Sequence, residues 1–111
     1  MIIKDEIAKQ TIYFKSLCEN HHVRYLYAFG SSITDNFDET KSDIDLFVEM
    51  DDKDPFIRGE NLISLWDKFE VFFHRKVDLL TSSSIRNPIL RKNIDATKIL
   101  IYDGKRGQIF V

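Results

Sequence analysis

The sequence has little of what marks a secreted, membrane-spanning or disordered chain. Its one cysteine, Cys18, cannot form an intrachain disulfide, which is typical of a protein of a reducing compartment. No apolar run approaches the roughly 18 residues that span a bilayer, and the start Met-Ile-Ile-Lys-Asp-Glu is too acidic for a signal peptide. We therefore expect a cytoplasmic protein that does not insert into membranes.

Glycine, proline and an excess of positive charge are also scarce. Four glycines and two prolines in 111 residues, with 43% hydrophobic and 31% charged residues, are the composition of an ordinary globular domain. The 16 basic residues are outnumbered by 18 acidic ones, so we do not expect nucleic acid as the main partner. We predict one domain over residues 1–111, which excludes a second catalytic or acceptor-binding domain.

Acidic residues are concentrated in one segment. Nine acids and two bases lie between Asp35 and Asp54, and the rest of the chain is net positive. A charge run of this kind is most often a solvated loop and strand end. The alternative is that some of these carboxylates hold divalent cations, and their position in the fold must decide between the two.

Hydrophobic periodicity and turn signals predict alternating helices and strands. Helical spacing predicts three helices, at residues 5–20, 54–73 and 87–94, and the last two begin at Asp-Pro and Asn-Pro pairs. Runs of strand-forming residues predict strands at residues 23–29, 42–50, 76–81 and 98–102. Residues 105–111 fit either a terminal strand or a frayed tail. The order indicates an α/β domain with a mixed β-sheet flanked by helices.

Three carboxylates occur at strand positions where chemistry is expected. Asp43 and Asp45 open the second predicted strand, and alternate side chains of a strand share a face, so both should project together while Ile44 points into the core. Asp78 lies within the third strand. If the second and third strands are neighbours, three carboxylates could hold two Mg²⁺ ions about 4 Å apart, the arrangement used for in-line displacement at phosphorus.

Gly30-Ser31, at the end of the first strand, completes this pattern. A residue without Cβ lets the backbone turn tightly and approach a phosphate, and Ser31 would add a hydroxyl donor. Each feature alone has a simpler interpretation: an ordinary turn for Gly30-Ser31, a solvated strand edge for the paired acids, and a salt bridge from Asp78 to Arg75 or Lys76. Only the ordered combination favours a phosphoryl-transfer site.

The sequence resembles a known family through three motifs. They are Phe29-Gly30-Ser31, then, after eleven residues, Asp43-Ile44-Asp45-Leu46-Phe47-Val48, and later Lys76-Val77-Asp78-Leu79-Leu80. Together they resemble the minimal nucleotidyltransferases of the DNA polymerase β superfamily, from the first helix to Tyr102. The resemblance implies a polymerase β-like nucleotidyltransferase fold and transfer of a nucleoside monophosphate from an NTP to a hydroxyl.

The resemblance also implies roles for individual residues and partners. Asp43 and Asp45 would hold Mg²⁺, with Mn²⁺ as the alternative, and Asp78 would be the third metal ligand or the base for the incoming hydroxyl. Gly30, Ser31 and Ser32 would bind the nucleotide. Such proteins typically accompany a HEPN-domain protein as antitoxin and toxin, and some add AMP from ATP to a tyrosine of the toxin. Homo- and hetero-oligomers both remain open.

One departure from the family leaves other functions open. The family often carries an arginine and a glycine after Gly-Ser, where this chain has Ile33-Thr34-Asp35-Asn36. Cations that could compensate are Arg75, Lys76, Arg86, Arg91 and Lys98. The alternatives are a catalytically weak or inactive binding module that neutralises its partner by contact, and transfer to a small antibiotic-like alcohol at a site completed by a second subunit.

Other conspicuous residues have structural interpretations. His21, His22 and His74 lack the spacing of a zinc site and are expected at the surface or at helix ends. The aromatic residues Trp66, Phe69, Phe72 and Phe73 recur at helical spacing, and we expect them in the core.

Overall fold

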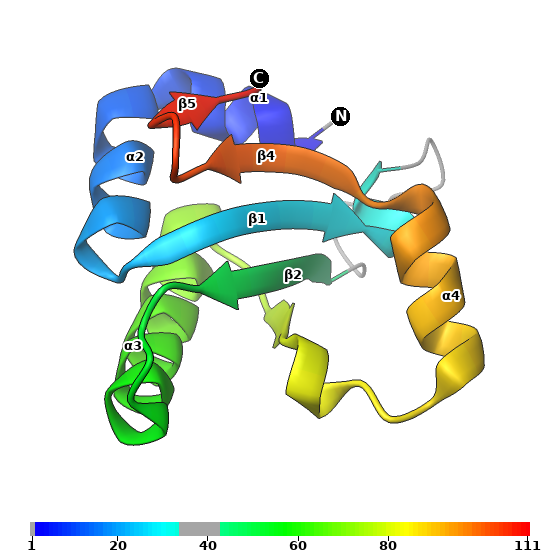
Figure 1. Cartoon of the computed structure of the whole chain (residues 1–111). Helices are drawn as coiled ribbons and strands as arrows, with labels where there is room; N and C mark the ends of the chain where they lie inside the picture. The colour runs from blue at the N-terminus through cyan, green and yellow to red at the C-terminus, as the bar shows by residue number, and fades with distance from the viewer. Residues whose placement is uncertain (1, 34–42) are drawn as a thin grey trace.

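The structure is a computed structural model that describes residues 2–33 and 43–111. Its helices and strands are α1 (Ile2–Lys9), α2 (Thr11–Asn20), β1 (Val23–Phe29), β2 (Ile44–Met50), α3 (Pro55–Phe73), β3 (Val77–Leu80), α4 (Pro88–Thr97), β4 (Ile99–Asp103) and β5 (Gln108–Ile109). Two 3-10 turns, η1 (Gly30–Ile33) and η2 (Ser82–Ser84), follow β1 and β3. The described strands form a mixed sheet in the order β3-β2-β1-β4-β5, and α4 stands apart from the other helices (Figure 1). The predicted α/β architecture is confirmed.

The N-terminal helix is broken where the sequence predicts continuity. Gln10, at φ −142° and ψ 51°, separates α1 from α2, and its N–H donates to the carbonyl of Ile7. The hydroxyl of Thr11 also bonds to the Ile7 carbonyl, the kind of local bond that competes with helix propagation. The break lets the apolar stripes of both helices reach the core. The prediction of one continuous helix over residues 5–20 was therefore wrong. The spacing of apolar residues does not reveal that the backbone leaves the helical conformation at a single residue.

The sheet combines one parallel pair with three antiparallel ones. β2 and β3 run parallel and are joined by α3, whereas β1 pairs antiparallel with β2 and β4, and β4 with β5. The predicted strand over residues 23–29 coincides with β1, and β5 shows that residues 105–111 contain a short strand. The loop predicted after Gly30-Ser31 lies mostly outside the described residues, as does Ser42.

The two faces of the sheet have different partners. On one face, Leu46, Val48 and their neighbours pack under α1, α2 and α3, where Phe14 stacks on Phe69 with ring centroids 5.4 Å apart. This core contains the predicted aromatic residues Phe69, Phe72 and Phe73, and the half-buried Trp66 packs against it. On the other face, Phe29 and Phe47 contact Ile94 of α4. One face is thus fully covered, and α4 covers only part of the other.

Helix ends account for the three histidines. His21 caps the C-terminus of α2 and is buried. Its two ring nitrogens are satisfied there by the carbonyl of Leu17 and the hydroxyl of Ser64. His22 and His74 adopt left-handed backbone conformations, at φ 59° and 54°. The prediction of helix ends agrees with the structure, although His21 is not at the surface. Within the described parts of the chain, every helix is too short or too polar to cross a bilayer.

Candidate active site

Parallel pairing brings two of the predicted carboxylates together. Asp45 of β2 lies directly opposite Asp78 of β3 in the register of the sheet. The register is fixed by buried neighbours on the helical face, where Ile44 and Leu46 are fully buried beneath the helices. Asp45 and Asp78 consequently share the face that α1, α2 and α3 leave uncovered, and their carboxyl groups are hydrogen-bonded to each other.

Asp43 lies just before β2 and completes the acidic group. Its Oδ2 is 3.9 Å from the Nζ of Lys76, in an ion pair in which the Lys76 side chain is exposed and the Asp43 side chain is partly exposed. The simpler interpretation of Asp78 in the sequence was a salt bridge to Arg75 or Lys76. Of these two bases, Lys76 pairs with Asp43 in the structure. Asp43 is also close enough to Asp45 for its charge to affect the ionisation of that carboxyl group.

The environment of Asp45 disfavours its negative charge. Burial, followed by the charges of Asp78 and Asp43, raises the pKa of Asp45 to about 6. Two carboxyl groups this close cannot both ionise freely unless a cation or a proton compensates them. In the described ranges, no group of three or more His, Cys, Asp or Glu side chains is arranged around a metal position. The donors fit a hard divalent cation in chemistry and charge, although their side chains do not converge on one.

Gly30 lies against the same carboxylate. It adopts φ +69°, and a Cβ built on it would overlap Asp45 Oδ2 and lie 3.3 Å from Asp45 Cγ. The residue before it, Phe29, is the register partner of Asp45 across β1 and β2. Glycine is therefore required both by backbone conformation and by space. The backbone of the predicted nucleotide-binding residues Ser31 and Ser32 continues from it as η1.

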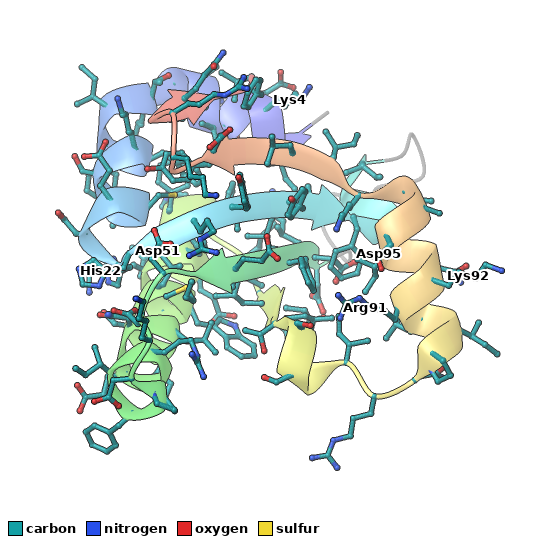
Figure 2. The ribbon with its side chains drawn as sticks, in the orientation of Figure 1. Lys4, His22, Asp51, Arg91, Lys92 and Asp95 are labelled. Carbon is teal, nitrogen blue, oxygen red and sulfur yellow. The ribbon has the colours of Figure 1, made fainter. Side chains whose placement is uncertain are left out.

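Arg91 of α4 and Lys98, the C-cap residue of α4, lie over the ring of Phe47 beside the carboxylates. Arg91 Cζ is 5.5 Å and Lys98 Nζ 5.3 Å from the centroid of the Phe47 ring, and Phe47 follows Asp45 by two residues on the same strand face. Figure 2 shows Arg91 and Asp95 directed from α4 toward the sheet. Both cations were among five candidates in the sequence, and only the packing of α4 distinguishes them.

A pocket lies at the C-terminal ends of the parallel strands. It has a volume of about 430 Å³ and is lined by Val48, Glu49, Met50, Pro55, Arg58, Gly59, Leu62, Thr81, Ser82 and Ser83. Sequence interpretation missed it, since its walls come from β2, α3 and η2, which no local motif connects. Crevices beyond the carboxyl ends of parallel strands are a common ligand position in α/β sheets.

The fold and these carboxylates define a class of protein that a family comparison identifies. Residues 13–107 match the family model described as "Polymerase beta, Nucleotidyltransferase". The chain belongs to this family and is a nucleotidyltransferase, as the three motifs predicted.

Two relatives come from Methanocaldococcus jannaschii. "Putative protein adenylyltransferase MJ1379" is 32% identical over 87 residues, which cover 78% of this chain and 85% of that protein. "Putative protein adenylyltransferase MJ0126" is 33% identical over the same shares of both chains.

Solved structures share the fold at lower identity. A chain of the toxin-antitoxin MntA-HpeT has a TM-score of 0.58 and 20% identity, covering 85% of this chain and 73% of that one. A chain of a toxin-antitoxin structure with AMP-PNP has a TM-score of 0.55 and 23% identity, covering 82% and 71%. A chain of the tri-AMPylated Shewanella oneidensis HEPN toxin in complex with MNT antitoxin has a TM-score of 0.51 and 19% identity, covering 96% and 76%. The predicted polymerase β-like fold is confirmed.

Proposed function

We propose that this protein transfers AMP from ATP to a hydroxyl group of a HEPN-domain toxin and so acts as its antitoxin. The observation that carries the proposal is the pairing of Asp45 with Asp78 beside Gly30, which brings two carboxylates into contact with a tight backbone turn. Relatives named as protein adenylyltransferases support AMP as the transferred group. Similar folds in HEPN toxin complexes support the class of partner.

Asp43, Asp45 and Asp78 are the residues that would hold Mg²⁺, or Mn²⁺ in its place. A bound divalent cation supplies neutralisation of the charge that develops on the phosphoryl oxygens. The acceptor oxygen forms a bond to the α-phosphorus while the bond between the α-phosphorus and the bridging oxygen breaks, and pyrophosphate leaves. The proton of the acceptor hydroxyl passes to Oδ of Asp78; where that carboxylate is instead the third metal ligand, the proton passes to water. Gly30, with Ser31 and Ser32 after it, binds the phosphate side of the nucleotide through backbone N–H groups.

The test is the intact mass of the HEPN-domain partner after incubation with this protein and Mg-ATP. We expect a mass increase of one or more AMP units with the wild-type chain and none with the double variant Asp43→Asn, Asp45→Asn. The double variant Asp51→Asn, Asp54→Asn removes the same charge from the same segment outside the site and should retain transfer. An unmodified partner with every NTP, in a stable complex, would contradict the proposal.

A second candidate is neutralisation of the partner by contact alone. The observation that favours it is that this chain has Ile33-Thr34-Asp35-Asn36 where the family often carries an arginine and a glycine after Gly-Ser. The two functions differ in ligand linkage, because a chain that binds Mg-ATP unfolds at a higher temperature in its presence. A contact-only module would show no such shift, in the wild-type chain or in the Asp45→Asn variant.

A further inference from the structure

Arg91 of α4 and Lys98, the C-cap residue of α4, are held in a fixed arrangement on the face that carries Asp45 and Asp78. Arg91 Nε donates to Asp95 Oδ2 and Lys98 Nζ to Asp95 Oδ1, both at 3.1 Å. Arg91 Nη1 also donates to the hydroxyl of Ser82 at 2.8 Å. One carboxylate therefore orients two cations, and the three side chains together keep a net positive charge.

The cations lie between aromatic rings and the solvent. Lys98 Nζ is 4.4 Å from the ring centroid of Tyr27, and both cations lie over Phe47. Their side chains remain 38% and 24% exposed for Arg91 and Lys98. A ligand that approaches this face reaches the two positive charges before it reaches the rings. The face therefore favours an anionic group over a base that stacks on the rings.

The packing of α4 sets the distance from the carboxylates. Ile94 contacts Phe29, the register partner of Asp45, and also Phe47. Residues two apart on a strand are separated by about 6.6 Å, so the residue under both cations, Phe47, is one such step along β2 from Asp45. In contrast, the residues directly after Gly30-Ser31-Ser32 are Ile33-Thr34-Asp35-Asn36, without a cation, and Lys41 is the one basic residue between β1 and β2. Arg91 and Lys98 therefore add positive charge that this segment supplies only once.

We propose that Arg91 and Lys98 together bind the β- and γ-phosphates of the nucleoside triphosphate. The inference rests on the proposed function, since it takes the α-phosphate to lie at the carboxylates. The leaving pyrophosphate then lies against α4, and Asp95 acts as a positioning residue that holds both cations on this face. The Lys98 ammonium and the Arg91 guanidinium N–H groups that Asp95 and Ser82 do not use are charged donors that suit phosphate oxygens.

The test measures binding of two nucleotides to the full chain by titration calorimetry in the presence of Mg²⁺. The probes are AMP-PNP, which carries β- and γ-phosphates, and AMP, which lacks them. We expect Arg91→Met and Lys98→Met each to raise the Kd for AMP-PNP about tenfold, the effect of losing one charge-assisted hydrogen bond, and to change the Kd for AMP less than about twofold. Arg91→Lys, which keeps the charge, should recover much of the affinity.

Lys92 provides the matched control. It neighbours Arg91 on α4 but points away from the sheet in Figure 2, so Lys92→Met removes one positive charge without changing Arg91, Asp95 or Lys98. We expect this variant to bind AMP-PNP as the wild-type chain does. Unchanged AMP-PNP binding by Arg91→Met and Lys98→Met, or an equal loss in Lys92→Met, would overturn the inference alone. A wild-type chain that binds neither nucleotide would overturn the proposed function as well.

Discussion

Gly30 and Asp45 are in such close contact that no side chain fits between them. The glycine backbone, at φ +69°, lies where a Cβ would overlap the Asp45 carboxylate. The contact joins the end of β1 to the start of β2, and through the register of β2 and β3 it extends to Asp78. The turn and the carboxylates are therefore one structural unit, and a change in either should affect the other.

Replacing Gly30 with alanine should destabilise the protein and abolish transfer. The left-handed conformation alone costs an alanine about 1–2 kcal/mol, and the overlap with Asp45 adds to this cost. The free energy of unfolding in urea measures the change. Gly59→Ala is the control, because nothing lies within 4 Å of its Cβ position in α3, and the better helix former should stabilise the protein by about 0.5–1 kcal/mol. Equal effects of the two substitutions would contradict the structural role of Gly30.

Asp45 should make the metal-free protein less stable at neutral pH than in mild acid. Its pKa is raised to about 6 in the folded chain, against about 3.9 in an unfolded one, so its contribution is full below the unfolded value and is lost as the pH rises through the folded value. The stability of Asp45→Asn relative to the wild-type chain should therefore increase as the pH rises from about 3.9 to about 6 and stay at its largest value above that. Urea unfolding in EDTA at several pH values measures the difference, and a constant difference would contradict it.

Added Mg²⁺ should reverse the order of these two proteins. A cation held by the carboxylates stabilises the ionised wild-type site but has fewer ligands in Asp45→Asn. The midpoint of thermal unfolding at neutral pH should thus rise with Mg²⁺ in the wild-type chain and much less in the variant. A rise of the same size in both would show that the ion binds elsewhere.

Asp52 should have the opposite pH dependence. Burial of its carboxylate, of which 8% is exposed, opposes ionisation, but hydrogen bonds from Asn61 and His22 outweigh it and hold the pKa of Asp52 below its ordinary value. Its contribution is present above the unfolded pKa of about 3.9 and is lost as the pH falls through the folded value. At neutral pH, Asp52→Asn should cost about 1–3 kcal/mol of unfolding free energy, and the cost should disappear in strong acid.

The neighbouring acid offers a control for this prediction. Asp51 pairs with Arg24 Nε, and both side chains are about half exposed, at 49% and 45%. Exposed pairs contribute about 0.2–1 kcal/mol, so Asp51→Asn should change stability little. If Asp52→Asn and Asp51→Asn change the unfolding free energy equally, the hydrogen bonds of Asp52 with Asn61 and His22 do not stabilise the fold as expected.

The thiol of Cys18 should react only when the protein unfolds. The side chain is fully buried in the core, and burial, aided by the charge of Glu19, raises its pKa well above the ordinary value. Since the thiolate is the reactive form, Ellman's reagent at mildly alkaline pH should label one thiol per chain in urea and none in the native protein. Rapid labelling without denaturant would show that α2 opens locally.

Local patterns in the sequence were sufficient for most elements of the fold. Asp54 and Asn87, each followed by proline, cap α3 and α4 as predicted, because capping depends on residues within one turn. Alternation correctly predicted Ile44 in the core beside an outward Asp45. The break at Gln10 and the extra turn of α4 could not be read in this way, since tertiary packing decides where a helix bends or ends.

The candidate site likewise depends partly on local sequence and partly on tertiary structure. The sequence by itself determined the residue types of the candidate site: a glycine at a strand end, two acids at the start of the next strand and a third acid in a later one. Only the tertiary structure decided that β2 and β3 pair in parallel with Asp45 opposite Asp78, and that Arg91 and Lys98 rather than Arg86 lie over Phe47. Strand order and register depend on burial summed over the whole sheet, and no local segment contains that information.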